Sequence, residues 1–117
     1  MLRSGITIEK GEVMNKKKMI HYIEPVTPGD LLNEEFLLPL GITKYRIAKE
    51  IGVPAQRIGE IVAGKRAITA DTDLRLCKYF GLSAGYWLRV QNKYDMEIAR
   101  RKIEHQLDGI IPLNRAI

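Results

Sequence analysis

The sequence predicts an all-α protein, a single domain of five helices packed in a compact bundle. Between residues 27 and 105, apolar side chains recur at the three- and four-residue spacing of amphipathic helices. Glycine and proline divide this region into five segments, and none of them shows the sustained alternation of a strand. At 117 residues, with 45% apolar and 28% charged residues, the chain has the size and composition of one globular domain.

The first two helices are delimited by threonine caps and by glycine or proline stops. Thr27 can cap a helix that begins at the next residue, a proline whose missing N–H costs nothing there. Pro39 and Gly41 are expected to end this helix. Thr43 can cap the second helix, KYRIAKEI, which Gly52 ends. The expected apolar side of the second helix consists of Tyr45, Ile47, Ala48 and Ile51.

The other three helices follow after short turns. The third begins at Pro54 and stops at Gly64. Thr69 caps the fourth, ADTDLRLCKYF, which ends at Gly81, and Ser83 is expected to cap a long fifth helix. The predicted inward side of the fourth helix consists of Leu74, Leu76, Cys77 and Phe80.

These helices make up one domain, residues 27–105, between two terminal segments. Residues 1–26 are expected to form a flexible basic extension, and residues 106–117 an irregular tail. The run Lys16-Lys17-Lys18 is either an arm that contacts phosphates or a solvated tail. No apolar run approaches the roughly 18 residues that span a bilayer, and the N-terminus lacks the apolar core of a secretory signal. We therefore expect a cytoplasmic protein without a membrane partner.

The sequence offers little for metal or catalytic chemistry. Cys77 is the only cysteine, and the two histidines, His21 and His105, lie far apart and outside any ligand spacing. No histidine–carboxylate pair and no activated serine or cysteine can be identified. We expect no metal site, no cofactor and no enzyme activity.

One stretch imitates a nucleotide-binding motif. GEIVAGKR, from Gly59 to Arg66, fits seven of the eight positions of the phosphate loop G-x-x-x-x-G-K-[ST]. A working phosphate loop follows a buried strand and provides a hydroxyl that binds Mg²⁺. Here Gly59 falls inside a predicted helix, and Arg66 cannot bind a cation. We interpret the match as accidental.

The second and third helices, joined by a turn at residues 52–54, have the form of a helix-turn-helix. The apolar residues expected to pack between them are Ile47, Ala48 and Ile51 with Ile58, Ile61 and Val62. This packing leaves the following on the outer surface of the third helix: Ala55, Gln56, Arg57, Gly59, Glu60 and Ala63. Such a surface suits the major groove of DNA.

The outer residues of this helix have the chemistry of base recognition. Gln56 can make bidentate bonds to adenine, and Arg57 can reach guanine or a phosphate. Glu60 can accept a hydrogen bond from a cytosine amino group. The small Gly59 and Ala63 would let the helix lie deep in the groove.

The neighbouring segments can bind the DNA backbone. Lys65 and Arg66 follow the third helix, and Thr43 with Lys44 begins the second, so that both sites can bind phosphate. Residues 44–66 contain six basic and two acidic residues, within a chain of net charge +5 and pI of about 9.4. The alternative is a helical hairpin inside a bundle, with merely solvated charges. A weak point of the DNA-binding interpretation is that Arg57 and Glu60, three residues apart, can satisfy each other.

The region from Thr27 to about Tyr94 resembles the HigA (VapI-like) antitoxins, a branch of the Xre/Cro-type helix-turn-helix proteins. The resemblance is carried by GVPAQRIGEIVAGKRAITADT together with SAGYWL. It implies a lambda-repressor-like bundle of five helices, usually a homodimer, that binds a palindromic operator in its own promoter. It also implies a protein partner, a HigB toxin, which is a RelE-like mRNA-cleaving ribonuclease encoded beside the antitoxin.

The resemblance extends to individual positions. The positions that match the family's base-facing helix are Ala55, Gln56, Gly59 and Glu60. Those that match its backbone contacts are Thr43, Lys44, Arg57 and Lys65. Two residues depart from the family pattern: Thr27 replaces a common histidine, and Arg89 replaces a frequent asparagine. Arg89 could alter a dimer or toxin contact.

The fifth helix is expected to carry the dimer contact, since a bundle this small can leave one apolar stripe for a partner. The candidate residues are Trp87, Val90, Gln91 and Tyr94. Trp87 is either a core residue or an anchor of this interface. Two other functions stay open: an Xre-family regulator without a toxin, and a protein-binding module that has lost its DNA role.

Overall fold

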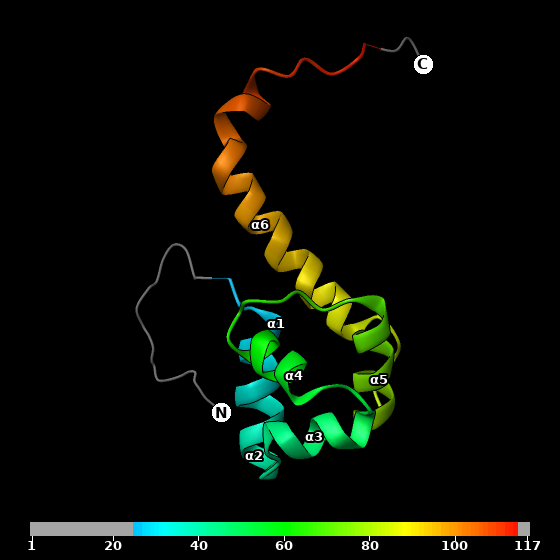
Figure 1. Ribbon diagram of the computed structural model, residues 1–117. Coiled ribbons are helices and arrows are strands. Elements are labelled where there is room, and N and C mark those ends of the chain that lie inside the picture. Colours follow the sequence, from blue (N-terminus) through cyan, green and yellow to red (C-terminus); the bar gives the residue numbers. More distant parts are fainter. Residues whose placement is uncertain (1–24, 115–117) are drawn as a thin grey trace.

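The computed structural model describes residues 25–114, and over this range the chain is helical with no strand (Figure 1). The elements are α1 (Pro28–Leu31), η1 (Leu32–Leu37), α2 (Leu38–Leu40), α3 (Lys44–Ile51), α4 (Ala55–Val62), α5 (Ala70–Phe80) and α6 (Tyr86–Asp108). Since α1, η1 and α2 follow one another without a break, the described residues form the five predicted helical segments. The predicted N-terminal extension lies outside them except for residues 25 and 26.

The three threonine caps are confirmed. In each, the threonine Oγ1 accepts a hydrogen bond from the N–H three residues further on, at 3.0 Å for Thr27, 3.0 Å for Thr43 and 3.4 Å for Thr69. Gly52 and Gly81 end α3 and α5 in the left-handed conformation, with φ of 76° and 70°. The helix boundaries thus follow from local side-chain chemistry.

The first helix contains a π-helical turn that the sequence pattern does not reveal. In η1 the N–H of Leu38 bonds to the carbonyl of Asn33, five residues earlier. In a regular α-helix, residues five apart point about 140° away from each other. The wider turn brings Leu32 and Leu37 toward the same side, and both are fully buried. Gly41 ends this helix as predicted, in the left-handed conformation, whereas Pro39 lies within α2.

The predicted packing of α3 against α4 is confirmed. The buried core consists of Leu32, Leu37, Ile47, Ala48, Ile51, Val53, Ile58, Ile61, Ile68, Leu76, Cys77 and Trp87. Two predicted core residues are wrong, since Tyr45 is 68% and Leu74 57% exposed. Each lies two residues before a fully buried residue, Ile47 and Leu76 respectively, and two residues are about 200° around a helix. Both side chains therefore point outward.

The first helix approaches α4 closely enough for backbone contact. A Cβ at Gly29 would lie 1.9 Å from the carbonyl oxygen of Ile61. No side chain larger than hydrogen fits between the two helices at this point. Gly29 therefore determines how close the first helix lies to α4.

Ser83 does not cap the long helix α6, contrary to the prediction. A residue of α5 caps it instead. Asp73 is 1% exposed, and its carboxylate accepts hydrogen bonds from the N–H groups of Gly85 (2.7 Å), Trp87 (2.8 Å) and Leu88 (3.1 Å). These groups belong to the first turn of α6, where unpaired N–H groups leave a partial positive charge. The buried carboxylate satisfies them and joins α5 to α6.

Beyond its first turns, α6 leaves the bundle. Figure 1 shows its C-terminal half extending away from the other helices, and it reaches Asp108, within the segment predicted as a tail. At Ile103 the backbone is non-helical, with φ of −117° and ψ of 18°. Between residues 25 and 114, no helix is long and apolar enough to cross a membrane.

Candidate nucleic-acid interface

The outer surface of α4 is made of the residues predicted for it. Ala55 and Gln56 are exposed, whereas Arg57, Gly59 and Glu60 are half-buried at the helix surface. The opposite side of the same helix is anchored in the core by two fully buried isoleucines, at positions 58 and 61. The helix is thus held firmly from inside and open from outside.

Three predicted DNA contacts are joined by hydrogen bonds on this surface. The amide nitrogen of Gln56 donates to Glu60 Oε2 at 2.9 Å, and Arg66 Nε donates to Glu60 Oε1 at 2.8 Å. The bond from Arg66, followed by that from Gln56, lowers the pKa of the Glu60 carboxyl group. Glu60 therefore orients Gln56, whose amide oxygen can still accept a bond from a base.

Arg57 pairs with Asp71 of α5 rather than with Glu60. Its Nη1 lies 3.5 Å from Asp71 Oδ1, and that carboxylate also accepts a bond of 2.7 Å from Arg75. Arg57 and Glu60 do not pair with each other, because Glu60 bonds to Gln56 and Arg66. Arg57 thus reaches toward the start of α5, beside the groove-facing surface of α4.

The predicted phosphate contacts flank α4. Lys44 and Lys65 are exposed, and neither has an ion-pair partner among residues 25–114. Thr43 is exposed at the N-terminus of α3, with its oxygen engaged in the helix cap. Arg66 is already paired with Glu60, through its Nε. Both lysines are therefore available to a phosphate.

The glycine inside α4 has no role in packing. A Cβ at Gly59 would meet nothing within 4 Å, and its φ is not positive. Alanine in the interior of a helix is about 1 kcal/mol more favourable than glycine. The fold therefore does not require this glycine, and its missing side chain matters only to a molecule that approaches from outside. Its place inside a helix also confirms that the phosphate-loop match is accidental.

The four predicted dimer residues are used mostly within the protomer. Trp87 is fully buried, so its role as a direct dimer contact is wrong and its core role is correct. Gln91 Oε1 accepts a hydrogen bond of 2.9 Å from the N–H of Ile68, which holds the loop before α5 against α6. Val90 and Tyr94 are half-buried.

Exposed apolar residues occur further along α6, where no prediction placed them. They are Met96, Ile103 and Leu107. Their spacing of seven and four residues would place them on one face of a regular helix, although the non-helical backbone at Ile103 separates Leu107 from the preceding turns. Within the described part of the chain, no cluster of histidine, cysteine and carboxylate side chains could hold a metal ion.

The tight α3–α4 pair, with its open outer surface and flanking lysines, defines the class: a helix-turn-helix DNA-binding protein. The helix-turn-helix family model matches residues 34–87, from η1 to the start of α6. The chain is 44% identical over 89 residues to Virulence-associated protein I of Dichelobacter nodosus, covering 76% of this chain and 82% of that protein.

Two solved structures extend the comparison. Antitoxin HigA of Pseudomonas aeruginosa, solved with the higBA promoter, has a TM-score of 0.73 and 34% identity, and the match covers 77% of this chain and 99% of that one. An addiction module antidote protein of the HigA family from Coxiella burnetii has the same TM-score of 0.73 and identity of 34%, with 79% and 100% covered. The chain belongs to the HigA (VapI-like) family of helix-turn-helix antitoxins, as the sequence motifs indicated.

Proposed function

We propose that this protein is the antitoxin of a type II toxin–antitoxin module in the cytoplasm. It binds and neutralises a HigB/RelE-like ribonuclease, and as a homodimer it represses its own operon by binding a palindromic operator. The observation that carries the proposal is the outer surface of α4, open and uncrowded, on a chain similar to an antitoxin solved with its promoter.

In this proposal α4 enters the major groove of the operator. Gln56, held by Glu60, presents its amide oxygen and its remaining N–H to an adenine. Gly59 lets the helix lie close to the bases because no side chain stands between them. Lys44 and Lys65 bind phosphates on either side and position the helix.

In this arrangement Arg66 can bind either Glu60 or a DNA phosphate. Arg66 lies on the same surface as Lys65, but its bond of 2.8 Å to Glu60 competes with a phosphate. Exposed ion pairs of this kind are weak because water screens both charges, so a phosphate can displace Glu60 from Arg66. Glu60 is then released to accept a hydrogen bond from a cytosine amino group.

The homodimer is proposed to form through the projecting half of α6. Met96, Ile103 and Leu107 are exposed there, on the half of α6 that extends away from the other helices (Figure 1). A two-fold pair of such helices buries these side chains, and it places two α4 helices for two half-sites. Val90 and Tyr94, at the base of the projection, keep enough exposed surface to contribute.

Two measurements test this function. The purified protein should shift DNA from its own promoter, and it should co-purify with the product of the adjacent gene when both are expressed together. A promoter shift without a toxin complex would instead assign a plain Xre-family regulator. A toxin complex without any promoter shift would assign a protein-binding module, and the absence of both would refute the proposal.

A further inference from the structure

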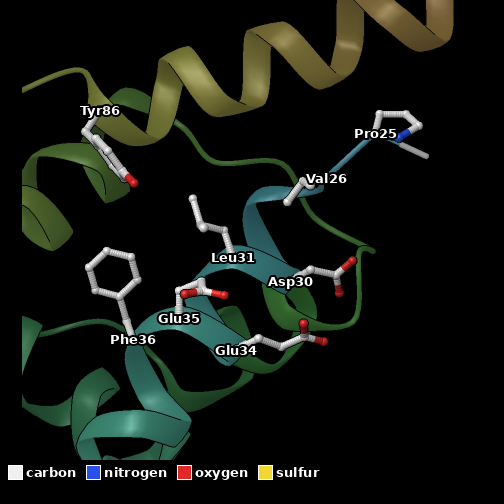
Figure 2. Close-up of a pocket in the computed structure, with 8 residues that line it drawn as sticks. All are labelled: Pro25, Val26, Asp30, Leu31, Glu34, Glu35, Phe36 and Tyr86. Atoms are coloured by element: carbon white, nitrogen blue, oxygen red, sulfur yellow. The ribbon is translucent and has the colours of Figure 1, made fainter. Parts of the chain in front are cut away.

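The outside of the first helix carries a groove that the DNA-binding surface does not use. Its volume is about 610 Å³, and Pro25, Val26, Asp30, Leu31, Glu34, Glu35, Phe36 and Tyr86 line it. Figure 2 shows Leu31, Phe36 and Tyr86 facing a common space, with the carboxylates of Asp30 and Glu34 toward the other edge. The groove therefore combines an apolar floor with an acidic rim.

The floor is backed by the core, so the groove exists before any partner arrives. The ring of Phe36 lies 4.7 Å from that of Phe80 and 5.1 Å from that of Trp87, measured between centroids. The ring of Tyr86 packs edge-on against Trp87 at 5.1 Å. Side chains fixed in this way lose little conformational entropy on binding.

The rim carries unbalanced negative charge. Asp30, Glu34 and Glu35 are exposed, and none has an ion-pair partner among the described residues. Residues 25–43 contain these three acidic residues and no lysine or arginine. Residues 44–66 contain six basic and two acidic residues. The two surfaces thus differ in sign, and the groove repels the phosphates that α4 attracts.

We propose that this groove binds a basic segment of the partner ribonuclease, an inference that rests on the proposed antitoxin function. Apolar side chains of the segment lie on the floor formed by Leu31, Phe36 and Tyr86. Its lysine or arginine side chains meet the three rim carboxylates. A ribonuclease must present cations to RNA phosphates, so an acidic groove is complementary to the surface that it uses for its substrate.

The placement also separates the two activities of the protein. The groove lies on the exposed side of α1 and η1, whereas DNA contact belongs to α4 and its flanking lysines. The first helix touches α4 through Gly29, on a different side from the groove carboxylates. The groove therefore shares no lining residue with the proposed DNA-binding surface.

The test compares two charge variants of the full-length protein, using the purified ribonuclease encoded by the adjacent gene as the probe. Glu34→Lys/Glu35→Lys reverses the rim of the groove. The control, Leu40→Lys/Leu74→Lys, adds positive charge at two exposed positions that lie outside the groove and outside the residues proposed for DNA and dimer contact. By calorimetry, the rim variant should bind at least about tenfold more weakly, because like charges then face each other. The control should change binding by less than about twofold.

Promoter-DNA binding is measured in parallel and should be retained by both variants, which shows that they are folded. Retained toxin binding by the rim variant overturns the groove assignment and leaves the antitoxin function standing. If the wild-type protein itself fails to bind the ribonuclease, the antitoxin function and the groove assignment both fail.

A rim variant that changes only the oligomeric state of the protein would assign the groove to a second copy. Altered proteolysis of residues 1–24 with unchanged toxin binding would assign it to this chain's own N-terminal segment. Either result overturns the proposal.

Discussion

One glycine lies on each side of α4, and the two differ in whether the packing of the fold requires them. On the inner side, Gly29 of the first helix touches the backbone of Ile61, so that a Cβ would lie 1.9 Å from a carbonyl oxygen. On the outer side, the space around Gly59 is empty to 4 Å. The first glycine is required by the fold, and the second is not. Because packing does not require Gly59, we infer that the absence of a side chain there serves a ligand that approaches α4 from outside.

The largest expected effect comes from filling the inner contact. Gly29→Ala should lower the free energy of unfolding by at least about 3 kcal/mol, since a backbone carbonyl cannot move aside as a side chain can. Chemical denaturation measures this change. A loss below about 1 kcal/mol would mean that the first helix can shift away from α4 at little cost.

The next effect concerns base recognition on the outer side. Gln56→Ala should cost roughly 1–3 kcal/mol of operator affinity and relax specificity at one base pair, while the free energy of unfolding hardly changes. Mobility shifts on promoter DNA and on random DNA measure the difference. Equal losses on the two DNAs would refute the base-reading role, because a phosphate contact does not depend on sequence.

A smaller effect is expected from the flanking charge. Lys65→Ala should weaken binding to all DNA sequences and reduce the slope of log affinity against log salt by about one. Lys78→Ala is the matched control, since Lys78 is an exposed lysine of α5 in a separate groove beside Tyr79. If both substitutions change the slope equally, Lys65 acts only through the net charge of the protein.

The smallest effect on stability has the opposite sign. Gly59→Ala should raise the free energy of unfolding by about 0.5–1 kcal/mol, because alanine has the higher helix propensity and the added methyl group meets no neighbour. The same substitution should weaken promoter binding. A variant that is more stable and binds as tightly as the wild type would show that α4 does not approach the bases closely at this position.

Local chemistry made much of this fold predictable. The threonine caps, the glycine stops and the isoleucines between α3 and α4 all act within a few residues of themselves, so their roles can be predicted from spacing. The prediction that Leu74 is buried is wrong because it follows from the apolar side chain alone. The position of Leu74 in the helix is opposite to that of the buried Leu76. Asp73 lies on the buried side, where an apolar residue would be expected.

Other features depend on contacts that no local pattern contains. Asp73 caps a helix whose first residue, Tyr86, lies 13 residues later, so only the folded chain reveals its partner. Trp87 has the spacing of either a core or a surface anchor, and the rings of Phe36 and Phe80 around it decide between them. The residues on the outer surface of α4 could be listed from the helix pattern, but the bond between Glu60 and Arg66 could not. The acidic groove needs side chains from both ends of the domain, Leu31 and Tyr86 among them.

The Asp73 cap has a consequence for the operator itself. In the proposed homodimer α6 holds the two protomers together, while α4 touches DNA, and the three hydrogen bonds of Asp73 fix the angle at which α6 leaves α5. Successive major-groove faces of B-DNA on one side of the duplex are about 34–36 Å apart. In this proposed dimer, the distance between the two operator half-sites would therefore depend on Asp73, a carboxylate that is not itself proposed to contact the DNA.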